Sequence, residues 1–310
     1  MSSASALLPP IGWAKHFAHP DCDRAPCPYI TDYDVCASIW FISWKFKDTR
    51  GSQVTDNAEL RPVFLDVGSP ARKIAVRARA GTEPGLFWLA GFNSDMNGTK
   101  AVALDQWADA HGRACVRFDY SGHGESGGAF TDGTISRWLE EAVAVFAAYC
   151  NGPQIVVGSS MGGWIALLLA RELRRRSEAA ANLAGLVLIA PAPDFTEALM
   201  WQQMAPESRR QIETEGVWLR PSEYGEPYPV TRGLIEDGRK HLLLNGSVET
   251  GCPVRIFQGR QDPDVPWQHA IELLAHLPGD DVVLTMIQDG DHRLSRPQDI
   301  ARILAALEEF

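Results

Sequence analysis

The chain has 310 residues, of which 45% are hydrophobic and 22% are charged, and its formal net charge at pH 7 is −10. This length allows one large globular domain or two small ones, and the composition supplies enough apolar side chains for a sizeable core. The negative net charge argues against binding to nucleic acid or to anionic lipid. No apolar run approaches the roughly 20 residues of a membrane-spanning helix, so no membrane span is predicted.

Residues 1–60 differ from the rest, because they are rich in Trp, Cys and Pro and show no clear periodicity. We expect a poorly ordered extension here, followed by one domain over 61–310. Three of the six cysteines lie in this extension beside His16 and His19. Their spacing matches no compact zinc pattern, so no metal site is predicted. The cysteines form no recognisable disulfide framework, which favours a reducing compartment.

From residue 61 onward the pattern becomes regular. Residues 62–67 and 73–79 are typical of a hairpin that turns at Gly68-Ser69-Pro70. Short apolar strands are then expected at 86–90, 114–118, 154–158, 185–190, 254–258 and 282–287, and helices at about 98–111, 132–149, 161–176, 266–277 and 297–309. Apolar strands that alternate with helices predict an α/β fold, with a mostly parallel sheet covered on both faces. We expect eight strands, of which the first two are antiparallel.

A tight turn between the strand at 154–158 and the following helix carries the first catalytic signal. Gly158-Ser159-Ser160-Met161-Gly162 fits the G-x-S-x-G pattern, with Ser160 at its centre. In such a nucleophile elbow the central residue takes strained backbone angles that aim its side chain at the helix N-terminus. The pattern is weak alone, but the strand before it and the helix after it supply the context it requires. Ser160 is therefore the predicted nucleophile, and Ser159 is expected to be a packing residue.

A serine hydroxyl needs a base, and the base needs a carboxylate that fixes its tautomer. Of eight histidines, His292 follows the last expected strand, at the edge where open sheets bind ligands. His123 follows an earlier strand and is the main competitor; we expect it to pack in its loop or line the site. Asp262 follows the strand at 254–258 and is the predicted carboxylate, whereas Asp264 is expected to begin the next helix.

The predicted nucleophile, acid and base occur along the chain in the order Ser160, Asp262, His292. This order is that of α/β-hydrolases and differs from the orders of chymotrypsin-like and subtilisin-like proteases. An oxyanion hole requires two N–H donors. We expect them to be the backbone amides of Met161, at the start of the helix, and Phe92, in the loop after the third strand. This chemistry requires no metal or organic cofactor.

Several segments also carry a resemblance to a known family: MNGTKA (96–101), ACVRFDYSG (114–122), GPQIVVGSSMGGW (152–164), GVW and PSEY within 216–224, CPVRIFQGRQDPDVPW (252–267) and DHRL (291–294). Over about 86–306 the chain resembles the α/β-hydrolases of the mitochondrial palmitoyl-protein thioesterase and mycophenolic acid acyl-glucuronide esterase family. The resemblance implies a triad on Ser160, Asp262 and His292, and hydrolysis of acylated small molecules or S-acylated proteins. It also implies a mitochondrial location, whereas a bacterial relative would act in the cytoplasm.

Residues 191–250 interrupt the alternation of strands and helices and are expected to contain no strand. α/β-hydrolases commonly vary at this point, so we expect a cap over the site. The large apolar residues of this segment either line an acyl channel or bury the cap against the sheet: Met200, Trp201, Met204, Val217, Trp218 and Leu219. Both interpretations remain open at this point.

Other activities of the same fold remain to be weighed. Ser160 argues against haloalkane dehalogenases and epoxide hydrolases, which use an aspartate nucleophile. A generic short-chain carboxylesterase is the main alternative to a thioesterase. A peptidase and a non-catalytic ligand receptor on the same scaffold are further alternatives, and the complete triad argues against the receptor.

Overall fold

An eight-stranded sheet organises the computed structural model, which describes residues 60–176, 183–221, 226–279 and 281–310. All of these residues belong to one unit of the chain, Asp56–Phe310. The predicted extension over 1–60, with its Cys and His residues, lies outside the described residues except for Leu60. Among the described residues, no helix has both the length and the apolar character needed to cross a bilayer.

The strands of the central sheet are β1 (Val63–Val67), β2 (Arg72–Arg79), β3 (Thr82–Leu89), β4 (Arg113–Phe118), β5 (Gln154–Ser159), β6 (Leu183–Ile189), β9 (Val254–Gly259) and β10 (Val282–Ile287). Their order across the sheet is β1-β2-β4-β3-β5-β6-β9-β10. Strand β2 is antiparallel to β1 and β4, and the remaining neighbours are parallel. The predicted mostly parallel sheet of eight strands with an antiparallel first pair is confirmed.

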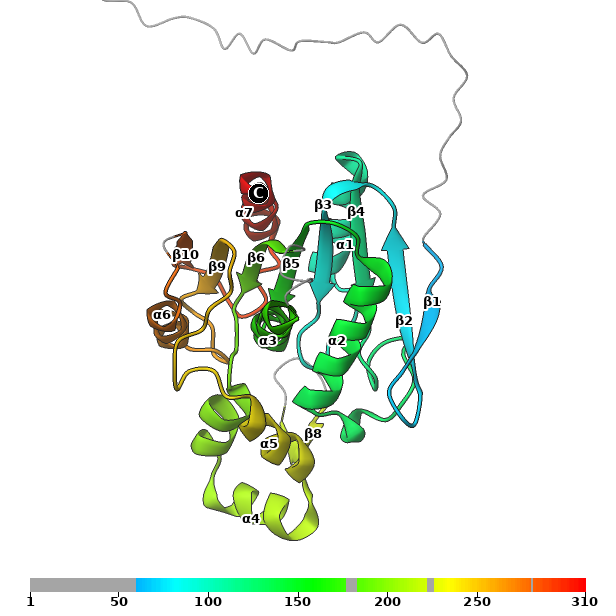
Figure 1. Ribbon diagram of the computed structural model, residues 1–310. Helices are drawn as coiled ribbons and strands as arrows, with labels where there is room; N and C mark the ends of the chain where they lie inside the picture. Colours follow the sequence, from blue (N-terminus) through cyan, green and yellow to red (C-terminus); the bar gives the residue numbers. More distant parts are fainter. Residues whose placement is uncertain (1–59, 177–182, 222–225, 280) are drawn as a thin grey trace, which may run out of the picture. The chain divides into compact units, whose positions relative to one another are not determined.

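Helices cover both faces of this sheet: α1 (Thr99–Ala110), α2 (Ile135–Tyr149), α3 (Met161–Arg175), α6 (Trp267–His276) and α7 (Pro297–Ala306). Helices α2 and α3 pack on each other in front of the sheet in Figure 1, and α1 packs with α7 behind it. All six residues of β5 are buried, as expected for a central strand covered on both sides. Two short 3₁₀ turns accompany these helices: η1 (Phe130–Asp132) precedes α2, and η6 (Leu307–Glu309) follows α7.

The chain reverses its direction of travel across the sheet between β3 and β5. Strand β3 is followed by β4 on one side, whereas β5 is followed by β6 on the other, although β3 and β5 are neighbours. The connections after these two strands therefore diverge to opposite faces and leave a crevice at their carboxyl ends, where open α/β sheets bind ligands. Leu89 and Gly158 are paired across β3 and β5, so the loops that follow begin side by side.

The insertion between β6 and β9 contains a π-helical turn, η3 (Thr196–Met200), the 3₁₀ turns η4 (Trp201–Gln203) and η5 (Arg239–His241), the helices α4 (Pro206–Glu215) and α5 (Arg232–Gly238), and the strands β7 (Val217–Arg220) and β8 (Tyr228–Thr231). Figure 1 shows α4, α5 and β8 gathered beyond one end of the sheet.

The prediction that the insertion has no strand is wrong. Strands β7 and β8 form an antiparallel pair of their own, from Val217 opposite Thr231 to Arg220 opposite Tyr228. Each is only four residues long and neither is buried on both faces. They therefore lack the continuous apolar run that marked the strands of the central sheet.

Candidate active site

Ser160 occupies a sharp turn between β5 and α3. Its backbone angles are φ 54° and ψ −117°, in a region that residues other than glycine rarely adopt. A Cβ atom on Gly162 would lie 2.1 Å from the carbonyl oxygen of Leu89, so only glycine lets the start of α3 approach β3 this closely. The turn carries the backbone strain predicted for a nucleophile elbow, and Ser160 lines a cavity.

The structure brings together the three side chains that the sequence predicted as a triad. The Nε2 atom of His292 lies 3.1 Å from the Oγ atom of Ser160, and its Nδ1 atom lies 2.8 Å from Oδ2 of Asp262. When Nδ1 carries the proton and donates it to the carboxylate, Nε2 has a free lone pair toward the serine hydroxyl. This tautomer can take the serine proton.

The carboxylate of Asp262 is fixed by hydrogen bonds on both of its oxygens. Its side chain is fully buried, and Oδ1 accepts the backbone N–H groups of Asp264 at 2.9 Å and Val265 at 2.8 Å. Oδ2 accepts from His292 and from the side-chain amide of Gln258, which lies 3.2 Å away. Gln258 was not predicted, although a glutamine within the apolar strand β9 was a signal that could have identified it.

The loops after β9 and β10 are joined by backbone hydrogen bonds. Arg260 N–H donates to the carbonyl of Ile287, and Gln261 N–H donates to the carbonyl of Gly290, both at 2.9 Å. A Cβ atom on Gly259 would lie 2.5 Å from the Gly290 carbonyl oxygen, so glycine is required for this approach. These contacts hold the loop that carries Asp262 against the loop that carries the histidine.

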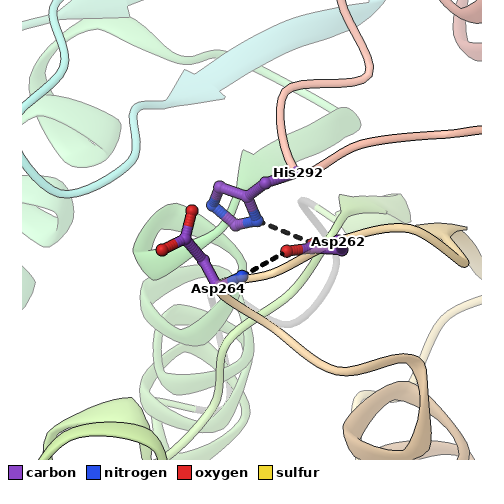
Figure 2. Close-up of side chains that lie close together, drawn as sticks. All are labelled: Asp262, Asp264 and His292. Atoms are coloured by element: carbon purple, nitrogen blue, oxygen red, sulfur yellow. Dashed lines mark hydrogen bonds and ion pairs between the residues drawn. The ribbon is translucent and has the colours of Figure 1, made fainter. Parts of the chain in front are cut away.

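Asp264 does not begin the next helix, so that prediction is wrong. The N-cap of α6 is Pro266, and no side chain makes a capping hydrogen bond there. Asp264 instead lines the cavity with its carboxylate near His292, as Figure 2 shows. The reason is local: the backbone N–H of Asp264 is bound by the Asp262 carboxylate, which turns the chain before the helix starts.

Asp262, Asp264 and His292 offer three possible metal ligands whose atoms lie within 4.8 Å of one another. A metal ligand needs a free lone pair. Nδ1 of His292 and Oδ2 of Asp262 are hydrogen-bonded to each other at 2.8 Å, and the other oxygen of Asp262 already accepts two N–H groups. The geometry fits an acid–imidazole pair better than a metal site.

The two predicted oxyanion donors flank Ser160. Met161 is the first residue of α3, so its N–H has no acceptor within the helix. Phe92 follows β3, and both residues line the cavity with Ser160. The ring of Phe92 is held by edge contacts with three other aromatic rings, whose centroids lie 4.9 to 5.9 Å away: Phe130, Trp138 and Tyr228.

His123, the competing histidine, supports the loop after β3. Its Nε2 atom accepts the backbone N–H of Asn93 at 3.2 Å, and its Nδ1 atom lies 3.2 Å from the carbonyl of Ser121. Burial lowers the pKa of His123, which favours the neutral ring that this pair of bonds requires. Asn93 adopts φ 55°, so the loop takes an unusual conformation at the point that His123 contacts.

A cavity of about 350 Å³ opens at Ser160, a volume within the range of small-molecule sites. Its apolar wall comes from the segment after β6, from the cap and from two loops of the sheet: Phe92, Phe195, Leu199, Met200, Tyr228 and Val265. Phe195 and Leu199 were not predicted, although they lie at η3, the turn that also contains Met200, and this proximity was a signal that could have identified them.

Among the large apolar cap residues for which both roles were open, Met200 lines this cavity, whereas Trp201, Met204 and Trp218 pack elsewhere. Trp201 packs under the guanidinium groups of Arg209 and Arg239, at 5.6 and 5.1 Å from its ring centre. Met204 is buried and Trp218 packs against the hydrophobic core. The cap therefore uses most of its large apolar residues for its own packing.

In sequence and in overall structure the chain is similar to known hydrolases. Residues 81–305 match the model of the alpha/beta hydrolase family. The human mitochondrial palmitoyl-protein thioesterase ABHD10 is 33% identical over 239 residues, which are 76% of each chain. A putative hydrolase from Agrobacterium vitis S4 is 52% identical, with a TM-score of 0.78 over 80% of this chain and 98% of that one. Mouse ABHD10 is 31% identical, with a TM-score of 0.72 over 80% of this chain and 97% of its own.

Proposed function

The chain belongs to the α/β-hydrolase family, and on this premise we propose that it is a serine hydrolase that cleaves carboxylic esters or thioesters through an acyl-enzyme. The observation that carries the proposal is the continuous hydrogen-bonded row from Asp262 through His292 to Ser160, with contacts of 2.8 and 3.1 Å. A serine in this setting loses its proton to the imidazole as it attacks.

In the proposed reaction, Oγ of Ser160 attacks the acyl carbonyl carbon while Nε2 of His292 takes the hydroxyl proton. The carbonyl oxygen becomes negative and accepts the N–H groups of Phe92 and Met161. The carboxylate of Asp262 stabilises the imidazolium that has formed. His292 then gives its proton to the departing oxygen or sulfur as the bond to the acyl carbon breaks. Water repeats the sequence on the acyl-enzyme and releases the acid.

Two observations support an acyl thioester or ester with an apolar acyl group as the substrate. The relatives named palmitoyl-protein thioesterase act on acylated substrates, and the cavity beside Ser160 is walled by apolar side chains. Acylated small molecules and S-acylated proteins are both candidate substrates. The mitochondrial names of these relatives support the mitochondrial alternative for its location, while the cytoplasmic expectation for a bacterial enzyme stays a prediction.

A chain-length series separates this substrate class from a generic short-chain carboxylesterase. Each buried methylene contributes about 0.8 kcal/mol, which corresponds to roughly a fourfold rise in kcat/KM per carbon until the cavity is filled. We expect kcat/KM for straight-chain acyl thioesters to climb from C4 and then level off. A flat profile from C4 to C12 would instead identify the short-chain esterase.

Replacement of the nucleophile tests the proposal most directly. Ser160→Ala should lower kcat by about 10⁴-fold or more, because triad members act as a unit. It should also abolish labelling by a fluorophosphonate, which reacts with an activated serine. Ser159→Ala is the matched control and should still be labelled. A Ser160→Ala enzyme that turns over substrate normally would refute the proposal, and absence of labelling in the wild type would favour a ligand receptor.

A further inference from the structure

A second cavity of about 240 Å³ also reaches Ser160 and His292. It shares Phe92, Asn93, Ser160 and His292 with the first cavity, and beyond these residues the two are lined by different elements. The first extends to the cap and the loop after β9. The second is formed by the loop after β3, the start of α1 and the residues that follow His292. The reacting atoms therefore lie where the two cavities meet.

The two cavities differ in chemistry. The wall of the first is largely aromatic and aliphatic, and its charged residues, Arg220 and Asp264, lie 4.0 Å apart as an ion pair. Outside the shared residues, the second is lined mainly by polar and charged side chains: Ser94, Asp95, Thr99, Lys100, Arg293 and Ser295. An ester or thioester also has two unlike parts, an acyl group and a leaving group, joined at the carbon that serine attacks. An apolar acyl chain fits the first cavity, which leaves the second for the departing alcohol or thiol.

Lys100 is one of two cationic residues that line this second cavity. Its Nζ atom donates to the carbonyl of Arg293, the residue after His292, at 2.5 Å, and to the hydroxyl of Ser295 at 3.4 Å. In the described part of the chain these hydrogen-bond acceptors are neutral oxygens rather than carboxylates. Asp291 acts on this ammonium electrostatically, but no ion pair of Lys100 forms among the described residues, so its charge can act on a bound molecule.

The second cavity also has acidic neighbours. Asp95 lines it and accepts the backbone N–H of Asn97, and Asp291 acts on Lys100 electrostatically. Arg293 adds a second positive charge to the lining. The amino end of α1 reaches the same cavity through Gly98 and Thr99, and a helix amino end carries partial positive charge.

We propose that the second cavity binds the leaving group, and that Lys100 there selects small thiols or alcohols that carry a carboxylate. This inference rests on the proposed function, because it requires Ser160 to be the nucleophile. Lys100 contacts the substrate in this role, and the carboxylate lies on the part that departs. Its attraction therefore acts on substrate binding and on the transition state, whatever acyl chain is present.

A matched pair of substrates tests the proposal: the octanoyl thioesters of mercaptoacetate and of mercaptoacetamide. The two share one acyl group and differ only in a carboxylate and its neutral amide. We expect wild-type kcat/KM to favour the anionic thioester by about 10-fold, the scale of one charge-assisted contact. Lys100→Met should reduce this ratio to about 1, through a larger loss on the anionic thioester than on the neutral one. Lys100→Arg should restore the preference, and Lys73→Met, at an exposed lysine of β2, should not change it.

The pH dependence provides a readout that a purely structural lysine would not change. Burial, together with the positive charge of Arg293, lowers the pKa of Lys100 to about 8, while Asp291 opposes the shift. The wild-type preference for the anionic thioester should therefore fall as the pH rises from about 7 to 9.5, where the ammonium is lost. Lys100→Arg should keep its preference across this range, because a guanidinium stays charged. Any effect of pH on the reacting groups that the two thioesters share acts on both alike and cancels in the ratio.

Three results would overturn the inference and leave the proposed function intact. They are a wild-type enzyme without preference, a preference that survives Lys100→Met, and an equal loss on both thioesters in that variant. The last would mean that Lys100 only holds the loop that carries His292. Failure of the proposed function looks different, because then Ser160→Ala would cleave the neutral thioester as fast as the wild type.

Discussion

The rim of the central sheet and the cap beyond it are built in contrasting ways. At the rim, each proposed catalytic group follows a parallel strand of the sheet, and backbone pairings such as Leu89 with Gly158 fix where the following loop begins. The cap is made of short helical turns and a four-residue strand pair that rests on side-chain packing. The difference teaches that the sheet positions the proposed catalytic groups. The cap, which is less regular and lines the cavity, can then vary without moving those groups.

The largest effect is expected at the rim, from Asp262→Asn. The amide can still accept one backbone N–H, but it no longer stabilises the imidazolium or enforces the required tautomer of His292. We expect kcat to fall by about 10⁴-fold with little change in KM. Steady-state kinetics will measure it, and Asp264→Asn is the matched control because its carboxylate lines the cavity outside the triad. A loss below about 10-fold would remove Asp262 from the proposed mechanism.

A smaller effect should separate two neighbours in the cap, Met200 and Trp201. Met200 lines the apolar cavity, so Met200→Ala should lower kcat/KM for long acyl thioesters by about 10-fold, equivalent to roughly two lost methylene contacts. Short thioesters should be affected little. Trp201→Ala removes packing beneath Arg209 and Arg239 and should lower the melting temperature without altering acyl-length preference. The reverse pattern, with selectivity changed by Trp201, would show that the cap rearranges around substrate.

The smallest effect concerns the attachment of the cap to the rest of the molecule. Asp237 in α5 accepts the backbone N–H of Ser136, in the first turn of α2, at 2.7 Å, and also its hydroxyl at 2.9 Å. Burial alone would raise the pKa of Asp237, but bonds from Ser136 and Lys240 outweigh it and lower the pKa below the ordinary value. The charged form is therefore favoured in the folded protein, and it stabilises the fold at pH values above the ordinary pKa of the carboxyl.

Asp237→Asn should accordingly cost about 1–2 kcal/mol of unfolding free energy at pH 7. This difference from the wild type should shrink as the pH falls from about 5 to 3, because the carboxylate becomes protonated through its folded pKa. Denaturant titrations at both ends of that range measure it. Glu236→Gln, at an exposed position of the same helix, should change stability at neither pH. A penalty that stays constant with pH would point to packing rather than charge.

The sheet was predictable because its information is local and repeated. Each strand is a short apolar run bounded by turn residues. Glycines at strand ends, such as Gly158 and Gly259, mark where the loops with the proposed catalytic residues begin. Ser160 and His292 were identifiable for the same reason, since loops at the carboxyl ends of parallel strands meet at one edge. Nothing in that reasoning required knowledge of which side chains touch.

The residues that escaped prediction depend on contacts formed only after folding. Lys100 looks like an ordinary surface lysine at a helix start until the loop after His292 folds against it. Trp218 has the size and polarity of an acyl-channel residue, yet the pairing of β7 with β8 directs it to the core. Asp264 resembles a helix cap until its backbone is bound by its neighbour Asp262.

The bonds that join the loops after β9 and β10 also bear on how the site can move. Asp262 and His292 follow β9 and β10, adjacent strands at the edge of the sheet, whereas Ser160 follows β5, which lies nearer the middle. A motion of the sheet edge would therefore carry the Asp262 carboxylate and the His292 imidazole together. The distance that it changes is the one between Oγ of Ser160 and Nε2 of His292.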